Sequence, residues 1–518
     1  MRPDAIVIGS GPAGVHAARA LLDAGKTVLI VDGGNAAPAI LEQSIGNFED
    51  VRRADPAQWK WFLGEDLSGI PVQGIEGGHG GGMTSGNRSY TTHDAERALP
   101  LKTTDAFVVQ SLATGGLGAA WGGACAIFDK QTLAAMGIDD PAMDACMTDV
   151  IRTIGVSGPG DHPDLQPPLP VDRHASRALL RYEQTPERFS VTIERPCNAV
   201  LSRPLGERSA NELNDMDYYT DAGRSMYRPR WTLDELIARG CVYEPGWIVT
   251  RFEETPDGAL VHGRSLATDE MKTWETRTVI LAAGAIGSAR IAAASMGLTG
   301  VAIPLVAKPH GYVACVDSAS LGDPGPKERL SLCQLLLVDR VRGPDELPAG
   351  AAQIYGYRSL LLFRLLSALP LPVPLAMRLL SLLTPSLVLA DVRFPGRATD
   401  GHTLTLRPDG TVDVRGNPRE WDAHDASLQT IKKALRTAGF LPVKTIKGPP
   451  GSSSHYAGTI PVSDDPARPL RCDRDGRIHG YERIHVADAA MFRCLPPLPH
   501  TLTLMANAYR IGMAITRA

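Results

Sequence analysis

The 518-residue sequence predicts an α/β protein, of the α+β kind, built from two domains. Three observations lead to this prediction. A glycine-rich turn joins an apolar strand to a helix at the N-terminus, a second strand–glycine–helix unit follows at residues 279–290, and short strands recur over residues 312–414. The first two are typical of a three-layer nucleotide-binding domain, and the third is typical of an antiparallel sheet with helices.

The N-terminal unit has the pattern of a Rossmann-like dinucleotide-binding fold. The apolar residues 5–8 lead directly into Gly9, Gly11 and Gly14, and Asp32 ends the next apolar run. Gly9 permits a tight turn, Gly11 lets the backbone approach a pyrophosphate, and Gly14 lets the helix pack closely on the strand. The helix N-terminus would attract the phosphates, and Asp32 is placed to accept hydrogen bonds from a ribose. A glycine-rich turn with nothing bound is the alternative.

Small residues surround a tryptophan at residues 115–124. Gly115 and Gly116 precede Trp121 in a stretch that leaves backbone amides uncovered. Contact with a flat cofactor would require such bare backbone, so we expect a cofactor-binding loop here. A helix start that is packed tightly for structural reasons is the alternative.

A second strand–glycine–helix unit occupies residues 279–290. Ala283 and Gly284 lie at its turn, where small side chains suit close approach to a dinucleotide. The unit is not a second GxGxxG, and the sequence has no other. A flavin enzyme reduced by NAD(P)H usually needs a second dinucleotide site, so we expect the electrons to come from the substrate itself.

Two excursions separate these units. Residues 131–230 carry short helical patterns and proline-rich connections, and residues 301–445 carry most of the predicted strands. We therefore assign residues 1–130, 231–300 and 446–518 to the nucleotide-binding domain, and both excursions to a substrate domain. An antiparallel sheet is expected from the strands at 312–316, 331–338, 388–394, 403–407 and 412–414.

The most apolar segment of the chain, residues 360–389, lies in the second excursion. Prolines and arginines interrupt its leucine-rich runs, and neither run approaches the about 20 residues that span a bilayer. Four interpretations stay open: core packing, a lid over a substrate with apolar parts, an interface with a partner subunit, and a monotopic membrane contact.

The last segment carries the residues best suited to catalysis. His455 opens the motif His-Tyr-Ala-Gly-Thr, and His500 follows Pro499 where a terminal helix begins at Thr501. Asp488 ends a strand between the two histidines. A helix that begins here points its positive end toward the group that His500 faces. A core histidine that is hydrogen-bonded for structure is the alternative for each imidazole.

Charge, the position of the first motif and the cysteine pattern bear on possible partners, cellular location and metal binding. A net charge of −4 gives no electrostatic reason to expect nucleic acid. The glycine fingerprint, Gly9-x-Gly11-x-x-Gly14, starts within ten residues of Met1. This leaves no room for an ordinary cleaved signal peptide and favours the cytoplasm. The eight cysteines show neither a CxxC pair nor metal-ligand spacing, so we expect reduced thiols and no metal.

Taken together, these motifs resemble the glucose–methanol–choline (GMC) flavoprotein oxidoreductases. The resemblance covers the fingerprint, the loop at 115–123, the turn at 282–290, and the C-terminal stretches HYAGT, VADAAMF and PHTLTLMANAYRI. It implies bound FAD with a substrate domain over the flavin. It also implies that His455 and His500 flank the substrate hydroxyl, that Asp488 touches the cofactor, and that the terminal helix points at the flavin's pyrimidine edge.

The sequence departs from this family in three respects. Ala120 stands where members with covalent flavin carry a histidine, so we expect non-covalent FAD. His500 stands where an asparagine is more frequent, and it follows a proline instead of preceding one. The substrate domain resembles that of no particular member, so the resemblance does not indicate which substrate this chain uses.

The resemblance and the chemistry together predict oxidation of an alcohol to a carbonyl. A neutral imidazole can take the hydroxyl proton, with His455 as the base and His500 as its partner. Flavin N5 would take the hydride, and O2 or another acceptor would reoxidise the flavin. A lyase with a redox-silent flavin and a non-enzymatic dinucleotide-binding protein are the alternatives. The sequence leaves open the alcohol, the choice between oxidase and dehydrogenase, and the oligomeric state.

Overall fold

The computed structural model describes residues 2–64, 86–323, 325–326, 328–343, 345–356 and 370–517. Five parallel strands from distant parts of the chain form the sheet that carries the fingerprint, in the order β23-β11-β1-β2-β7. These strands are β1 Ala5–Ile8, β2 Val28–Val31, β7 Val242–Glu244, β11 Thr278–Leu281 and β23 Ile484–Val486. Because parallel strands end at the same edge, the turns after β1, β11 and β23 become neighbours.

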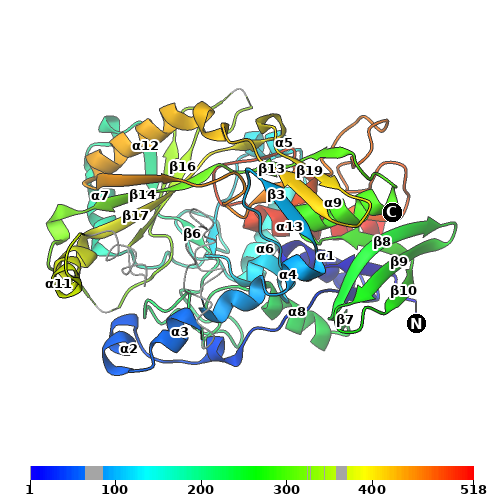
Figure 1. Ribbon diagram of the computed structural model, residues 1–518, viewed down its shortest axis with the longest axis horizontal. Coiled ribbons are helices and arrows are strands. Elements are labelled where there is room, and N and C mark those ends of the chain that lie inside the picture. Colours follow the sequence, from blue (N-terminus) through cyan, green and yellow to red (C-terminus); the bar gives the residue numbers. More distant parts are fainter. Residues whose placement is uncertain are drawn as a thin grey trace.

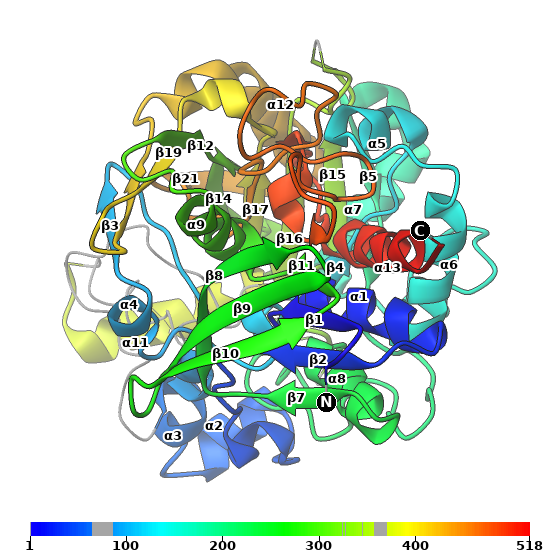
Figure 2. The same cartoon turned by 90° about the vertical axis from the view of Figure 1, so that its right-hand side faces the viewer.

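Helices and a second sheet pack around this parallel sheet (Figures 1 and 2). Helix α1, Pro12–Asp23, packs against β1 and β2 and against the terminal helix α13, Thr501–Arg517. A Cβ atom at Gly512 of α13 would lie 2.7 Å from the Ala17 carbonyl oxygen, so the two helices approach this closely because Gly512 lacks a side chain. The antiparallel sheet consists of β8 Trp247–Thr255, β9 Gly258–Ser265 and β10 Met271–Thr276.

A six-stranded antiparallel sheet forms the other end of the molecule (Figure 1). In spatial order its strands are β21 Leu441–Lys447, β14 His310–Val316, β17 Leu387–Arg393, β16 Ala351–Gly356, β15 Leu335–Asp339 and β5 Val191–Glu194. One face is apolar and packs against α7, Arg173–Gln184, and α12, Asp425–Ala438. The apolar interior predicted for this region therefore lies between a sheet and two helices.

The opposite face of the same sheet is polar. Side chains alternate between faces along a strand, and cross-strand partners share a face. Asp391 pairs with Tyr312 on β14 and with Gln353 on β16, and Arg393 pairs with His310. All five therefore project from the face that the apolar cluster does not use.

The predicted mixed α/β class is confirmed, but one part of the sheet prediction is wrong. The strands expected at 403–407 and 412–414 do not join the six-stranded sheet. They are β19, Thr403–Leu406, and β20, Val412–Arg415, of a separate sheet with the order β12-β19-β20-β3. Its other strands are β12, Ala302–Pro304, and β3, Leu101–Thr104. Alternation and the turn at 408–410 predict a hairpin, but neither predicts which sheet the hairpin joins.

Two segments of the predicted substrate domain contribute to the core around the parallel sheet. Helix α6, Met143–Ile154, packs against α13. Leu404 and Val412 lie in the same buried cluster as Ile6 of β1. The domain boundaries stay a prediction.

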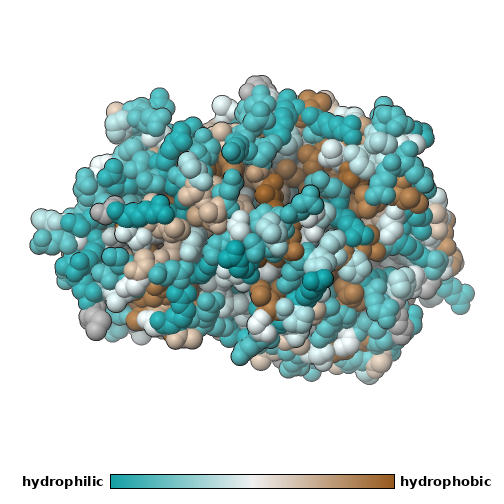
Figure 3. Space-filling model, turned by 180° about the vertical axis from the view of Figure 1, so that it is seen from behind, coloured by the Kyte–Doolittle hydropathy of each residue, from teal (hydrophilic) through white to brown (hydrophobic). Residues whose placement is uncertain are grey.

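The apolar segment at 360–389 is described in part, because residues 357–369 lie outside the described ranges. Helix α11, Val373–Leu383, buries Ala376 and Leu380 and exposes Leu375 and Leu382. In the described part of the chain, no helix is both long and apolar enough to cross a membrane. Seen from behind, the surface is largely hydrophilic, with hydrophobic residues in separate patches (Figure 3).

Candidate active site

The turn between β1 and α1 forms a cradle with a bare backbone. Gly9 has φ +103°, and a Cβ there would lie 2.6 Å from the Ala282 carbonyl oxygen. A Cβ at Gly14 would lie 1.9 Å from the Gly9 carbonyl oxygen, so a side chain at either position would clash with backbone. Gly11 is the N-cap of α1, and among the described residues no side chain caps it. The helix N-terminus is therefore free to bind an anion.

Ser10 joins two of the predicted cofactor residues, Asp32 and Gly115. Its backbone N–H donates to Oδ2 of Asp32 at 3.1 Å, and its hydroxyl also donates to this carboxylate. The N–H of Gly115 donates to the Ser10 hydroxyl at 2.9 Å. Burial raises the pKa of Asp32 to about 6, although the hydrogen bonds from Ser10 act to lower it. Gly116, at the start of the same loop, lies beside Gly11.

Asp488 fixes the second half of the predicted cofactor region. Its Oδ2 accepts from the Ser288 hydroxyl at 2.5 Å, and its Oδ1 accepts from the Ala490 N–H at 2.8 Å. The N–H of Ala283 donates to the same Ser288 hydroxyl at 3.2 Å, and Gly284 begins helix α9, Gly284–Ser295. Burial raises the pKa of Asp488 to about 6. Contact between Asp488 and a cofactor stays a prediction.

Trp121 is held in place by Tyr227, which lies in a distant segment of the same chain. Its indole N–H donates to the Tyr227 carbonyl at 2.7 Å, and the two rings meet edge-to-face with centroids 6.5 Å apart. The loop before it contains a short 3₁₀ turn, Gly116–Ala119. The indole is therefore fixed in orientation, whichever group lies against it.

The two predicted catalytic histidines meet. The rings of His455 and His500 lie with centroids 4.9 Å apart at an angle of 69°. His500 is buried at the end of the turn that precedes α13, and the partly buried Thr501 is the first residue of that helix. Within the described residues, Nδ1 of His500 has no hydrogen-bond partner. One imidazole nitrogen is thus available beside a second imidazole.

Arg393 of β17 lies against His455, which the sequence analysis did not anticipate. Its Nη1 is 3.0 Å from Nδ1 and 3.3 Å from Nε2 of His455. Its other nitrogens donate to Asp391 at 3.0 and 2.8 Å, and Nε2 of His310 lies 3.2 Å from the same carboxylate. A guanidinium cannot accept a hydrogen bond, so only one of these two contacts can be a hydrogen bond, the one to the unprotonated nitrogen of His455.

The electrostatics of this group favour neutral histidines. Burial lowers the pKa of His455 well below its usual value, and Arg393 and Lys308 lower it further. The pKa of His500 is also lowered, first by burial and then by Lys308 and Arg393. Burial would raise the pKa of Asp391, but Arg393 and His310 outweigh it and hold that pKa low. A carboxylate paired with a guanidinium therefore lies beside two uncharged imidazoles.

Lys308 is a second basic side chain near the pair. It is fully buried at 0% exposure, and its Nζ donates to the Leu498 carbonyl at 2.6 Å. That carbonyl belongs to the turn that presents His500. Burial lowers the pKa of Lys308, with a further contribution from Arg393. The Nζ group of Lys308 thus ties the segment before β14 to the turn that presents His500.

Neutral phenols complete the polar face. Burial raises the pKa values of Tyr312 and Tyr355 above the usual range. Tyr355 donates to the Gln353 side chain at 2.5 Å, and the Tyr312 ring packs edge-to-face on His310 at 4.8 Å. These groups offer hydrogen bonds to a polar ligand without adding charge. The sequence carried one signal for this face, because Asp391 and Arg393 interrupt an otherwise apolar strand two residues apart.

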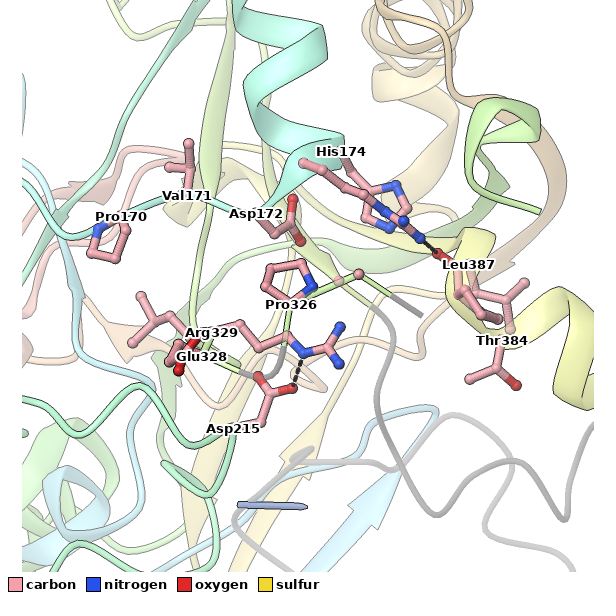
Figure 4. A pocket seen from close by; sticks show the side chains of 15 residues that line it. Pro170, Val171, Asp172, His174, Asp215, Pro326, Glu328, Arg329, Thr384 and Leu387 are labelled. Atoms are coloured by element: carbon pink, nitrogen blue, oxygen red, sulfur yellow. Dashed lines mark hydrogen bonds and ion pairs between the residues drawn. The ribbon is translucent and has the colours of Figure 1, made fainter. Parts of the chain in front are cut away.

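A separate pocket lies where α7 begins (Figure 4). It is lined by Asp172, His174, Asp215 and Arg329, and Nε of Arg329 lies 3.1 Å from Oδ2 of Asp215. It contains none of the predicted site residues. Over the described ranges, no group of His, Cys, Asp and Glu could hold a metal ion, and all eight cysteines are free thiols.

Comparison with known sequences gives a partial match. No family model matches the chain. Over 109 residues the chain is 31% identical to 6'''-hydroxyparomomycin C oxidase from Streptomyces lividus, a match that covers 21% of this chain and 20% of that protein. The matched part thus spans about a fifth of that curated relative.

Two solved structures match over the full length. Pyridoxine 4-oxidase from Mesorbium loti superposes with a TM-score of 0.62 at 12% identity, covering 99% of both chains. The chain has a GMC-like FAD-dependent oxidoreductase fold. An FAD-dependent oxidoreductase from Chaetomium thermophilum agrees, with a TM-score of 0.60, 12% identity and 99% coverage of both chains. The resemblance predicted from the sequence motifs is confirmed at the level of the fold.

Proposed function

We propose that this chain is an FAD-dependent enzyme that oxidises the CH–OH group of a small molecule to a carbonyl. The observation that carries the proposal is the pair His455 and His500, two neutral imidazoles at the N-terminus of α13 beside the polar sheet face. A matching solved structure and the curated relative are both oxidases.

The residues present fit FAD. The bare turn at Gly9 and Gly11 and the uncapped start of α1 would hold its pyrophosphate, and Asp32 would hold a ribose. Ala120 offers no atom for a covalent bond to the flavin, so the cofactor would be held by non-covalent contacts. When bound, FAD supplies the acceptor for the hydride that leaves the alcohol carbon.

In this proposal, His455 takes the hydroxyl proton of the substrate on its unprotonated nitrogen, and Arg393 gives up its hydrogen bond to that nitrogen as the proton arrives. An imidazole can act as a base when it is neutral, and burial together with Arg393 keeps it neutral below its usual pKa. Arg393 would also stabilise the negative charge that develops on the substrate oxygen. His500 holds the same hydroxyl from the other side, with the N-terminus of α13 directly behind it.

The polar face would orient the rest of the alcohol. Tyr312, Tyr355 and Gln353 present hydroxyl and amide groups from three positions on two strands. A polar molecule with several hydroxyl or ring-nitrogen groups would satisfy them. O2 or another small acceptor would complete the cycle, and a cytoplasmic location stays a prediction.

A panel of alcohols mixed anaerobically with the FAD-loaded protein tests this proposal. We expect at least one sugar-like, heterocyclic or secondary-metabolite alcohol to bleach the flavin absorbance near 450 nm, roughly in proportion to the carbonyl formed. Product formation while the flavin stays oxidised would favour a lyase of the same fold. Binding without either change would favour a non-enzymatic dinucleotide-binding protein.

A further inference from the structure

A buried arginine lies next to the cofactor loop without a full set of hydrogen-bond acceptors. Arg88 belongs to the 3₁₀ turn Gly86–Thr91 and is 2% exposed. Its Nη2 donates to the Asp217 carbonyl at 2.8 Å. Among the described residues, its Nε and Nη1 have no acceptor. A buried guanidinium with unmade hydrogen bonds is costly, so these N–H groups point to an acceptor that the described residues do not supply.

A second guanidinium lies nearby. Arg228 donates to the Ala119 carbonyl of the cofactor loop, and its charge adds to burial in lowering the pKa of Arg88 to about 9. Over the described ranges, neither arginine forms an ion pair with a carboxylate. Asp221 is the acid that interacts with both, but its two oxygens already accept from the Ser225 N–H and hydroxyl and from the Met226 N–H. Among the described residues, the carboxylate that faces both guanidinium groups is therefore already hydrogen-bonded to its own turn.

The cluster lies between the cofactor cradle and the polar sheet face. Arg88 lies over the ring of Tyr218 at 5.5 Å, and a Cβ at Gly122 would be 3.0 Å from the Tyr218 hydroxyl. Arg228 is the N-cap of helix α8, Pro229–Ala238, which has no acidic residue in its first turn. Pro229 packs beside Pro12, the first residue of α1, at Gly118. The positive ends of two helices therefore lie close to the two guanidinium groups.

We propose that Arg88 and Arg228, with the N-terminus of α8, bind an anionic group, either a phosphate or a carboxylate. The planar N–H fork of a guanidinium matches two oxygens of such a group, and a second cation beside it raises the affinity. The anion accepts hydrogen bonds from Nε and Nη1 of Arg88, which have no acceptor among the described residues. Its source is either an acidic group on the substrate or the pyrophosphate of the cofactor.

Inorganic phosphate is the probe, measured by thermal shift at constant ionic strength on the FAD-loaded protein and on the protein stripped of FAD. We expect phosphate to stabilise at least one form, and Arg88→Met and Arg228→Met each to weaken phosphate binding by about tenfold or more. Arg251→Met, at an exposed arginine of β8, should leave phosphate binding unchanged. These measurements need no turnover, so their failure is distinct from failure of the proposed oxidation.

The two forms of the protein distinguish the sources of the anion. An arginine-dependent phosphate effect in the FAD-loaded protein assigns the site to an acidic group of the substrate. An effect confined to the stripped protein, with FAD binding weakened by Arg88→Met and riboflavin binding unchanged, assigns it to the pyrophosphate. If phosphate stabilises neither form, or stabilises both arginine variants as much as the wild type, the site does not exist. Arg228→Met decides the question by itself if Arg88→Met fails to fold.

Discussion

At the scale of single residues, the charges around the histidine pair decide what the pair can do. Arg393 lies 3.0 Å from His455 and is itself paired with Asp391. A positive neighbour keeps a base unprotonated and ready to accept a proton at lower pH than an isolated histidine would allow.

Replacing Arg393 should shift the pH dependence of the reaction. The pKa of His455 is lowered in the folded protein, so the wild type should keep its base neutral well below the usual histidine pKa. Arg393→Gln removes the positive charge and leaves the Asp391 carboxylate nearby, so the pKa of His455 should rise. The acid limb of kcat/KM, measured from about pH 5 to 9, should therefore move to higher pH.

Arg407→Gln is the matched control, because Arg407 forms an ion pair at 2.5 Å with Asp413 of β20, which belongs to a different sheet from Arg393. Its pH profile should equal that of the wild type. An acid limb of Arg393→Gln that coincides with the wild-type limb would show that Arg393 does not control the base.

Lys308 offers a test of positioning. Lys308→Met keeps the length and shape of the side chain but loses the hydrogen bond to the Leu498 carbonyl, two residues before His500. The turn should then hold His500 less accurately, and substrate oxidation should slow by about 10- to 100-fold while FAD content stays the same. The pKa of His500 should also rise, because Lys308 contributes to lowering it.

Lys447→Met serves as its control, since Lys447 forms a surface ion pair with Asp425. A Lys308→Met protein with normal kcat and an unchanged pH profile would mean that the buried ammonium serves the fold alone.

The sequence was informative about residues that form motifs and uninformative about residues that meet through sheet pairing. His455 and His500 could be predicted because each stands in a recognisable local pattern. Arg393 and Lys308 could not, because their proximity to the pair depends on the register of β17 with β14 and on the path of the chain into β14.

At the scale of elements, the strands and helices around the fingerprint follow closely from the sequence. The predicted strand at 5–8 is β1, and the predicted helix from 501 is α13. The hairpin β19–β20 was predicted as a hairpin but assigned to the wrong sheet. Local turn chemistry determines pairing between neighbours, whereas the choice of sheet depends on long-range packing.

Helix α11 allows a sharp test of which apolar residues belong to the core. Leu380 is 6% exposed and Leu382 is 58% exposed on the same helix. Leu380→Ser should lower the free energy of unfolding by about 2–5 kcal/mol, the cost of emptying a buried site. Leu382→Ser should change it by less than about 0.5 kcal/mol, as is usual for surface positions. Urea denaturation of both variants measures the difference.

If Leu382→Ser destabilises the protein as much as Leu380→Ser, the outer side of α11 is covered in the folded state. Leu361 and Leu365, which belong to the same predicted apolar segment, lie outside the described residues. The interpretations of 360–389 as lid, interface or membrane contact therefore stay open.

At the scale of the whole molecule, the architecture brings together parts of the chain that are hundreds of residues apart. The parallel sheet aligns the N-terminal, middle and C-terminal motifs, and the polar face of the six-stranded sheet contacts His455 through Arg393. The first arrangement could be predicted because each motif has a strand before it. The second could not, because the one signal for the polar face, Asp391 and Arg393 within an apolar strand, does not indicate which residues that face meets.

The account rests on proton removal by the histidine pair. The most direct measurement is the anaerobic rate of flavin bleaching by an active alcohol in His455→Ala, His500→Ala and the control His174→Ala, a buried histidine on α7 paired with Asp317 at 2.8 Å. We predict that each site variant binds FAD and melts like the wild type but bleaches about 10²-fold more slowly or worse, while the control keeps the wild-type rate. Wild-type bleaching in a site variant that retains its FAD would contradict the account.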